Sequence, residues 1–463
     1  MSALRGVAAW TGPVLLGVVT TRVAAGAPDA PLLVLAAIVA PLVALLQPRA
    51  AETPHPVLAG AVVVSATLVL AASIAPLGDA ALLLGGQRWY GIVLATSVLL
   101  LLTLSPRGHG WPVAALAAGG TVLVLCLVLL AYATGLSPWS AWRHAAARPA
   151  LLFSAHSPWV TDSGWFARRT TLAFEEGHRL LVVVPGTFRV VEQEGTGHVV
   201  RQWRLQAGDP LSVRPGDRLI VEAGSRLRFE AGKRVPGAAL SGAAWAEAGS
   251  VPLVASLAGL ATLLLGAIGL VPAARKRELV APLALLVLGL AAACWGIYAV
   301  AAVPETMLSG SVVEPLLRLP GALPGARGLA PLVALALLAL LLSAAGALHE
   351  RVTALAGARG PAVWGGVVVV AAVASFWPFD PWLLLMTGLG FAAATLAGPR
   401  LAGPGPARVM GWPVAAFGAL AGGAVFVAII ALEPRLPIAL VSLAQSPTLV
   451  AAPAGFLVVK LLR

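Results

Sequence analysis

Charged residues are scarce in this sequence. Asp, Glu, Lys and Arg together make up 11% of its 463 residues, whereas 59% are hydrophobic. Soluble globular proteins carry roughly 25% charged residues, so the composition excludes an ordinary water-soluble fold. A chain this apolar is solvated by lipid, and the sequence therefore predicts an integral membrane protein.

Cysteine and histidine are also rare, which argues against several kinds of site. Cys126 and Cys294 lie in separate apolar runs, and neither has a histidine or a second cysteine near it in the sequence. No apolar run carries a histidine pair of the kind that ligates haem. Nucleotide-binding, HExxH and G-x-S-x-G patterns do not occur. We therefore predict no catalytic residues, no metal site and no cofactor.

Long apolar runs fill most of the chain. A helix needs ~20 apolar residues to cross the hydrocarbon core of a bilayer. Runs that approach this length lie at 5–24, 31–47, 56–76, 80–104, 112–134, 251–272, 280–303, 329–348, 361–377, 381–398, 411–432 and 436–459. The first resembles a signal peptide but lacks a clear cleavage site, so we treat it as a retained helix. The predicted fold class is a polytopic α-helical membrane protein with about 12 transmembrane helices.

The links between these runs alternate in charge. One set carries the basic residues Arg5, Arg49, Arg107, Arg275–Arg277, Arg351, Arg359, Arg400, Arg408, Lys460 and Arg463. The other set carries the acids Asp29, Asp79, Glu305, Glu314, Asp380 and Glu433 with three arginines, and Arg22 alone fits the alternation poorly. By the positive-inside rule both termini are predicted to be cytoplasmic, in a bacterial inner membrane. The net charge of +12 is thereby explained without nucleic acid as a partner.

A polar segment at 135–250 separates a membrane region of about five helices (1–134) from one of about seven (251–463). Its lead-in is rich in tryptophan (Trp139, Trp142, Trp159 and Trp165), which is typical of the membrane interface. Alternating strands are predicted at 168–175, 178–185, 187–194 and 198–206, and Gly208, Gly216, Gly224 and Gly232 then mark an eight-residue turn-and-strand repeat. This pattern predicts a small antiparallel β barrel or sandwich. The orientation places it outside the cytoplasm, in the periplasm.

The link at 304–328 falls on the same side as this β domain. Its proline and glycine content argues against regular structure, although 311–319 could form a short amphipathic helix at the interface. Because the link and the β domain share a side, we expect the link to pack beneath the domain.

Two groups of side chains are candidates for binding. In the first group, six basic residues recur near the eight-residue period: Arg214, Arg218, Arg226, Arg228, Lys233 and Arg234. They could form one cationic stripe that binds an acidic partner protein or anionic lipid. The alternative is that they are only the solvated face of a sheet. Inside the apolar runs the polar candidates are Gln87, Arg88 and Tyr90, and Gln445 and Ser446 next to Pro447. Arg88 either joins its neighbours in a substrate or lipid contact or lies at the outer interface, with a helix beginning at Trp89.

Three functions fit these observations. We favour a non-catalytic integral membrane subunit or scaffold whose β domain docks protein partners in a cell-envelope complex, because the centres of the runs carry almost no charge. The alternative is a transporter or flippase for an apolar or lipid-like substrate. A membrane glycosyltransferase or polymerase would need an outside carboxylate, for which Asp29, Asp162, Glu305 and Asp380 are the candidates. Membrane lipids are partners in every case.

Overall fold

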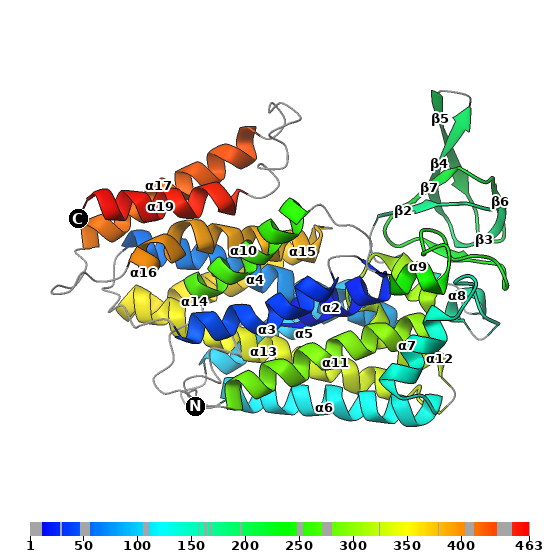
Figure 1. The fold of residues 1–463 in the computed structure, drawn as a ribbon, viewed down its shortest axis with the longest axis horizontal. Coiled ribbons are helices and arrows are strands. Elements are labelled where there is room, and N and C mark those ends of the chain that lie inside the picture. Colours follow the sequence, from blue (N-terminus) through cyan, green and yellow to red (C-terminus); the bar gives the residue numbers. More distant parts are fainter. Residues whose placement is uncertain are drawn as a thin grey trace.

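The computed structural model of the chain describes residues 12–462 apart from 28–29, 47–55, 105–110, 156, 162–163, 167–168, 195–196, 248–252, 271–279, 324, 378, 403–411 and 433–446. The described part is mostly helical, with two small antiparallel sheets gathered at one end (Figure 1). We call residues 151–238, which contain the strands, the β-module, and the remaining packed helices the helical body.

The helical body is built from the apolar runs. Its helices are α2 (Pro13–Ala24), α3 (Ala30–Leu46), α4 (Pro56–Leu83), α5 (Arg88–Leu104), α6 (Trp111–Thr134), α7 (Pro138–Ala146), α9 (Gly242–Ala246), α10 (Leu253–Leu270), α11 (Val280–Ala302), α12 (Glu314–Ala322), α13 (Leu329–Ala356), α14 (Gly360–Phe376), α15 (Pro381–Ala392), α16 (Gly398–Ala402), α17 (Trp412–Leu432) and α19 (Thr448–Leu461). Short 3₁₀ turns η1 (Pro304–Ser309) and η2 (Gly357–Arg359) and a π-helical turn η3 (Ala393–Ala397) complete it.

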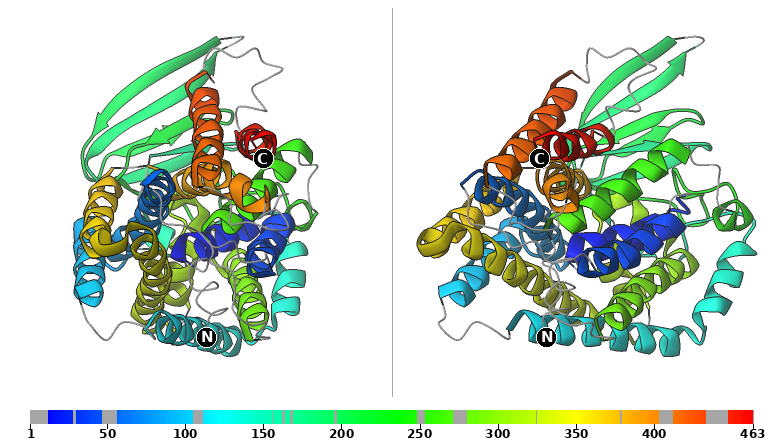
Figure 2. Two further views of the ribbon diagram at one scale, coloured as in Figure 1. Left: turned by 90° about the vertical axis from the view of Figure 1, so that its left-hand side faces the viewer. Right: turned by 60° about the vertical axis from the view of Figure 1, so that its left-hand side comes forward.

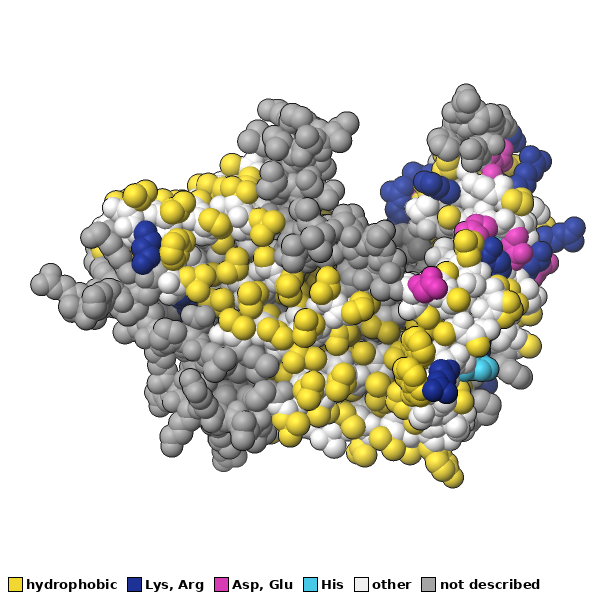
Figure 3. All heavy atoms as spheres, in the orientation of Figure 1, with side chains coloured by type: hydrophobic (Ala, Val, Ile, Leu, Met, Phe, Trp, Pro, Cys, Tyr) yellow, Lys and Arg dark blue, Asp and Glu magenta, His cyan; other side chains and the backbone are white. Residues whose placement is uncertain are grey.

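Among the described residues, five helices are long and apolar enough to cross a membrane: those within α4, α6, α11, α13 and α17. Seven shorter apolar helices accompany them. On the face shown in Figure 3, hydrophobic side chains predominate over the described part of the helical body, whereas most of the visible charged side chains lie on the β-module. Length and surface together indicate a membrane-embedded protein.

Two helix boundaries differ from the prediction. Helix α4 continues past Pro76 to Leu83, so Asp79 lies inside a helix and not in a link. Helix α5 begins at Arg88, after a turn in which Gly85 adopts a positive φ of 92°. The predicted run at 80–104 therefore divides between the two helices, because the glycines of that stretch favour a turn over a helix interior.

The β-module is a sandwich of two four-stranded antiparallel sheets. Strands β1 (Gly164–Trp165), β8 (Arg226–Arg228), β3 (His178–Val184) and β6 (Pro210–Val213) form one sheet in that order. Strands β2 (Thr170–Ala173), β7 (Arg218–Val221), β4 (Gly186–Glu194) and β5 (Gly197–Leu205) form the other. The strands pair as β1–β8, β2–β7, β3–β6 and β4–β5, as in one long hairpin wrapped on itself, and this is the strand order of a jelly roll. Strands β1 to β4 form the incoming half of this hairpin, and β5 to β8 form the returning half.

The eight-residue repeat has a direct structural role. Its four glycines have φ values between 78° and 92°, a left-handed conformation that other residues rarely adopt. Each glycine N–H donates to the carbonyl of a buried residue in the incoming half of the hairpin, at 2.7–2.8 Å: Val182, Phe174, Phe166 and Phe153 accept in turn from Gly208, Gly216, Gly224 and Gly232. The repeat thus fastens the returning half of the hairpin to the incoming half at regular intervals.

The β-module packs directly on the helical body, and the segments on either side of it in the chain are also held to that body. Leu308, from turn η1, is 3% exposed and belongs to the hydrophobic core of the β-module. The Trp245 indole N–H donates to the carbonyls of Val23 and Ala24 on α2, both at 3.1 Å. The Tyr298 hydroxyl donates to the Leu136 carbonyl at 2.6 Å. The expected packing of the 304–328 link under the β-module is confirmed, but the link is mainly two short helices, η1 and α12, and not an irregular segment.

Trp159 does not belong to the interfacial belt that the sequence predicts. It is 1% exposed and packs in the core of the β-module with Phe166 and Phe229. On α7, Trp139 is exposed and stacks on the half-buried Trp142, with ring centroids 4.9 Å apart. Tryptophan suits both a belt and a core, so the closure of the sandwich decides which one it joins.

Candidate functional site

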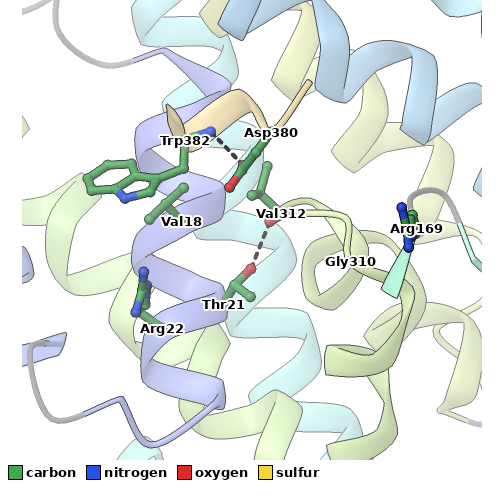
Figure 4. Close-up of a pocket in the computed structure, with 8 residues that line it drawn as sticks. All are labelled: Val18, Thr21, Arg22, Arg169, Gly310, Val312, Asp380 and Trp382. Carbon is green, nitrogen blue, oxygen red and sulfur yellow. Dashed lines mark hydrogen bonds between the residues drawn. The ribbon is translucent and has the colours of Figure 1, made fainter. Parts of the chain in front are cut away.

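The helical body and the β-module meet around a pocket of about 300 Å³, which we call the junction pocket (Figure 4). It is neither closed nor flat, and it draws on four parts of the chain. Its lining comes from helix α2, the segment between η1 and α12, the start of α15, and the residue before strand β2: Val18, Thr21, Arg22, Gly310, Val312, Asp380, Trp382 and Arg169.

One wall of the junction pocket is held by a close approach of two backbones. The Thr21 hydroxyl donates to the carbonyls of Gly17 at 2.8 Å and Val312 at 3.0 Å. A Cβ atom on Gly17 would lie only 2.6 Å from the Val312 carbonyl oxygen, so glycine is required there. The α2 wall and the 310–312 segment are therefore fixed relative to each other.

The charged lining has mixed sign. Arg22 lies in the last turn of α2 and is half-buried. Arg169 is exposed and makes a loose ion pair with Glu222 at 3.7 Å. Asp380 is the N-cap of α15, where its carboxylate accepts the Trp382 backbone N–H at 2.9 Å. Two guanidinium groups and one carboxylate thus border a small space that is also walled by valines and an indole.

A buried ion pair lies close to the same end of the helical body. Asp79 is fully buried and pairs with the Arg88 guanidinium at 3.1 Å. The Ser311 hydroxyl donates to the other carboxylate oxygen at 3.1 Å. Asp79 therefore joins α4 to α5 and to the segment that borders the junction pocket.

A second buried carboxylate, that of Glu305, belongs to η1 and lies near Ser157 of the β-module and Arg148 of the segment that precedes it. It is fully buried, and burial raises its pKa to about 7. The Ser157 hydroxyl and the Arg148 guanidinium offset part of that rise. Burial lowers the pKa of Arg148 in turn. Glu305 is therefore part of the contact between the start of the β-module and the helical body.

The predicted set Gln87, Arg88 and Tyr90 does not converge. Arg88 turns to Asp79, whereas Gln87 accepts the Trp89 indole N–H and Tyr90 is 49% exposed. Helix α5 begins at Arg88, which agrees with the interpretation that Arg88 lies at the start of a helix. Its side chain, however, forms an ion pair with Asp79 and does not simply extend to the interface. Gln445 and Ser446 lie outside the described residues, as do Asp29 and Asp162.

The six predicted basic residues are divided between the sheets. Successive eight-residue repeats place β6, β7 and β8 alternately in one sheet and the other. Arg218 therefore lies on the opposite sheet from Arg226 and Arg228, while Arg214 lies in the turn before β7. Arg234 pairs with Glu175 at 2.7 Å, and Lys233 is next to it in the chain. A single stripe is not formed, and a role in partner or lipid contact stays a prediction for these residues.

The β4–β5 pair projects beyond the rest of the sandwich, and we call it the ribbon (residues 186–205; Figures 1 and 2). Strand β5 is an edge strand of its sheet in the described part of the chain. Its apolar side chains are unusually open, with Val199 38%, Val200 60% and Trp203 44% exposed. Trp203 lies opposite the buried Phe188, so it faces the core side of the sheet at a point where the other sheet no longer covers it.

No metal centre emerges from the residues that the structure describes, since nowhere in them do three or more His, Cys, Asp or Glu side chains gather in a way that could hold an ion. His178 is buried beside Phe174 and Phe229 in the sandwich core. Its pKa is lowered by burial above all, and the nearby charges of Glu176, Lys233 and Glu230 modify this. A neutral histidine in an apolar core fits this arrangement.

The sequence contained signals for part of this site. Arg22 was the basic residue that fitted the charge alternation poorly, and it lines the junction pocket. Asp380 was expected in a link on the side of the β domain, which agrees with its place next to that domain. Asp79 was missed as a buried group, because its proline- and glycine-flanked stretch resembles a link.

Comparison with known proteins adds no relative: the chain matches no family model, no curated protein and no solved structure.

Proposed function

We propose that this protein is a non-catalytic, multi-pass protein of a bacterial inner membrane whose β-module docks a partner protein of the cell envelope through the ribbon. All twelve apolar helices, five long and seven shorter, cross the bilayer in this proposal. The termini are cytoplasmic and the β-module is extracytoplasmic, in keeping with the charge of the links.

The exposed edge of strand β5 is the observation that carries the proposal. An edge strand presents a row of backbone donors and acceptors that an extended segment of another protein can pair with. Proteins commonly blunt such edges, yet β5 offers Val199, Val200 and Trp203 at the surface. Tryptophan is also one of the residues enriched among those that contribute most of the binding energy at protein interfaces. Because the β-module packs on the helical body, a partner bound to the ribbon would be held in a defined orientation relative to that body.

The docking proposal is tested by substitutions in the ribbon of the full-length protein. Val200→Asp and Trp203→Ala should abolish stoichiometric co-purification of the partner in mild detergent after cross-linking in the membrane. Arg179→Ala is the matched control, because Arg179 is exposed on the other sheet, whereas Arg228→Ala tests the predicted basic residues. Capture that survives both ribbon substitutions but fails in Arg228→Ala would reject the ribbon as the docking site and favour the basic residues.

The orientation has its own test. In a chain with Cys126 and Cys294 replaced by alanine, a cysteine introduced by Val200→Cys should react with an impermeant maleimide in intact spheroplasts. A cysteine introduced by Arg359→Cys should react only in inverted vesicles. The reverse pattern would contradict an extracytoplasmic β-module.

Transport of a lipid-like substrate is the second candidate, and the Asp79–Arg88 pair favours it. Charged groups inside transmembrane helices are costly and commonly mark a functional site. Protein reconstituted into liposomes with a fluorescent phospholipid should then expose the inner-leaflet lipid to dithionite. Asp79→Asn, if it keeps wild-type thermal stability, should stop this exposure. If liposomes that contain the wild-type chain lose no more fluorescence to dithionite than protein-free liposomes, transport of that lipid is rejected.

A further inference from the structure

We infer that the junction pocket binds the headgroup of an amine-bearing phospholipid of the phosphoethanolamine type. This assignment goes beyond both proposals above, because it requires neither a docked protein nor transport. It depends on the position of the pocket, the sign of its charges and its size.

The pocket lies where a lipid headgroup would lie. Arg22 is in the last turn of α2 and Asp380 caps the first turn of α15, so the pocket is at helix ends and not at their middles. Val18, one turn further into α2, continues the wall toward the apolar part of the helix. Trp382 stands at the same level, and indole rings favour the region between hydrocarbon and water. The junction pocket thus passes from a polar mouth to an apolar side within one helical turn.

The charges match a zwitterionic group better than a simple anion. Guanidinium groups bind phosphate oxygens through charge-assisted hydrogen bonds, and Arg22 and Arg169 border the pocket from different elements (Figure 4). Asp380 would repel a purely anionic headgroup, but its carboxylate can accept hydrogen bonds from a primary ammonium. The Trp382 indole adds a face that attracts a cation.

The size also fits a headgroup. A volume of about 300 Å³ is at the lower end of the range of roughly 300–1,000 Å³ that small-molecule pockets occupy. The headgroup would fill this space while the acyl chains run along the apolar surface of the helices. The β-module contributes Arg169, so lipid binding would also tie the β-module to the membrane.

Native mass spectrometry of the delipidated full-length protein tests the assignment. The probes are phosphatidylethanolamine and phosphatidylglycerol with identical acyl chains, and free phosphoethanolamine. We expect phosphatidylethanolamine to bind about tenfold more tightly than phosphatidylglycerol, since one hydrogen bond to a charged group accounts for such a factor. Asp380→Asn should remove this preference, and because asparagine caps helices as well as aspartate does, α15 should remain intact.

Arg169→Gln should weaken both lipids, whereas Arg179→Gln, a matched change at an exposed arginine of β3 outside the pocket, should not. An unchanged lipid preference in Asp380→Asn would overturn the assignment. Equal losses in the two arginine variants would also overturn it, because general surface charge would then explain binding. Free phosphoethanolamine that binds as tightly as the lipid would overturn the lipid assignment in favour of a soluble ligand.

Discussion

Asp79 and Arg88 form an ion pair of 3.1 Å that joins the end of helix α4 to the start of helix α5. The carboxylate is fully buried, while the arginine side chain keeps 21% of its surface exposed. Gly78 lies next to Asp79, and a Cβ atom there would come within 2.9 Å of the Arg88 side chain. The tight turn between the two helices is thus built around this pair.

Removing the arginine should destabilise the protein strongly. Arg88→Leu leaves the Asp79 carboxylate buried without its cation, and we expect a loss of about 3–5 kcal/mol in the free energy of unfolding. The double variant Asp79→Asn, Arg88→Leu should recover most of that loss, because no uncompensated charge stays buried. Unfolding in detergent, followed by temperature and by denaturant, measures both. A double variant as unstable as the single one would show that the ion pair is not the cause.

Protonation of His178 should destabilise the β-module as the pH falls. Its pKa is lowered in the folded state, so below the unfolded value of about 6.5 the unfolded chain binds the proton more readily. Stability should decrease as the pH falls from about 6.5 and stop decreasing below the folded pKa. His178→Leu should flatten this part of the pH profile of the melting temperature, and His144→Gln, an exposed control, should not.

Glu305 should act in the opposite direction. Its pKa is about 7 in the folded chain, compared with the ordinary value of 4.5. Between pH 4.5 and pH 7 the folded state therefore binds the proton more tightly than the unfolded state does. The contribution of Glu305 to stability should therefore be greatest below about pH 4.5 and fall as the pH rises to about 7, by an amount on the order of 3 kcal/mol. Glu305→Gln should remove this fall. A melting profile of Glu305→Gln that keeps the wild-type slope between these pH values would contradict the prediction.

Two glycines in apolar helices should respond differently to substitution by alanine. A Cβ atom on Gly422 of α17 would clash with the Ala394 carbonyl oxygen in the π-helical turn, which leaves no room for a methyl group. Gly422→Ala should therefore lower the melting temperature in detergent. Gly365 of α14 has nothing within 4 Å, so Gly365→Ala should be neutral or stabilising by about 0.5–1 kcal/mol. Equal effects of the two changes would argue against close packing of α17 on η3.

The strands of the β-module were predicted to within a few residues, except for the shortest. Alternation and turn residues are local signals, and β3, β4 and β5 each carry a full set of them. Strand β1 has only two residues and exists because Gly164 and Trp165 pair with Leu227 and Arg226. A pairing between segments some 60 residues apart gives no signal in the sequence near either segment, and β1 was therefore not predicted.

The candidate site was harder to predict than the fold. The period of eight placed the basic residues at similar points of successive repeats, but alternate strands join opposite sheets, and this separates their side chains. Arg22, Arg169 and Asp380 come from distant parts of the chain and share no motif. Their proximity follows from how the β-module sits on the helical body.

The sequence by itself determined the apolar helices, the position of the β-module between them and the turns of its eight-residue repeat. Each of these depends on side chains within a few residues of one another, so hydrophobicity, alternation and glycine conformation specify them locally. Only the tertiary structure decided that Trp159 joins a core, that Asp79 is buried against Arg88, and that three charged side chains border one pocket. Those outcomes depend on burial and on contacts between distant segments, which arise only when the whole chain packs.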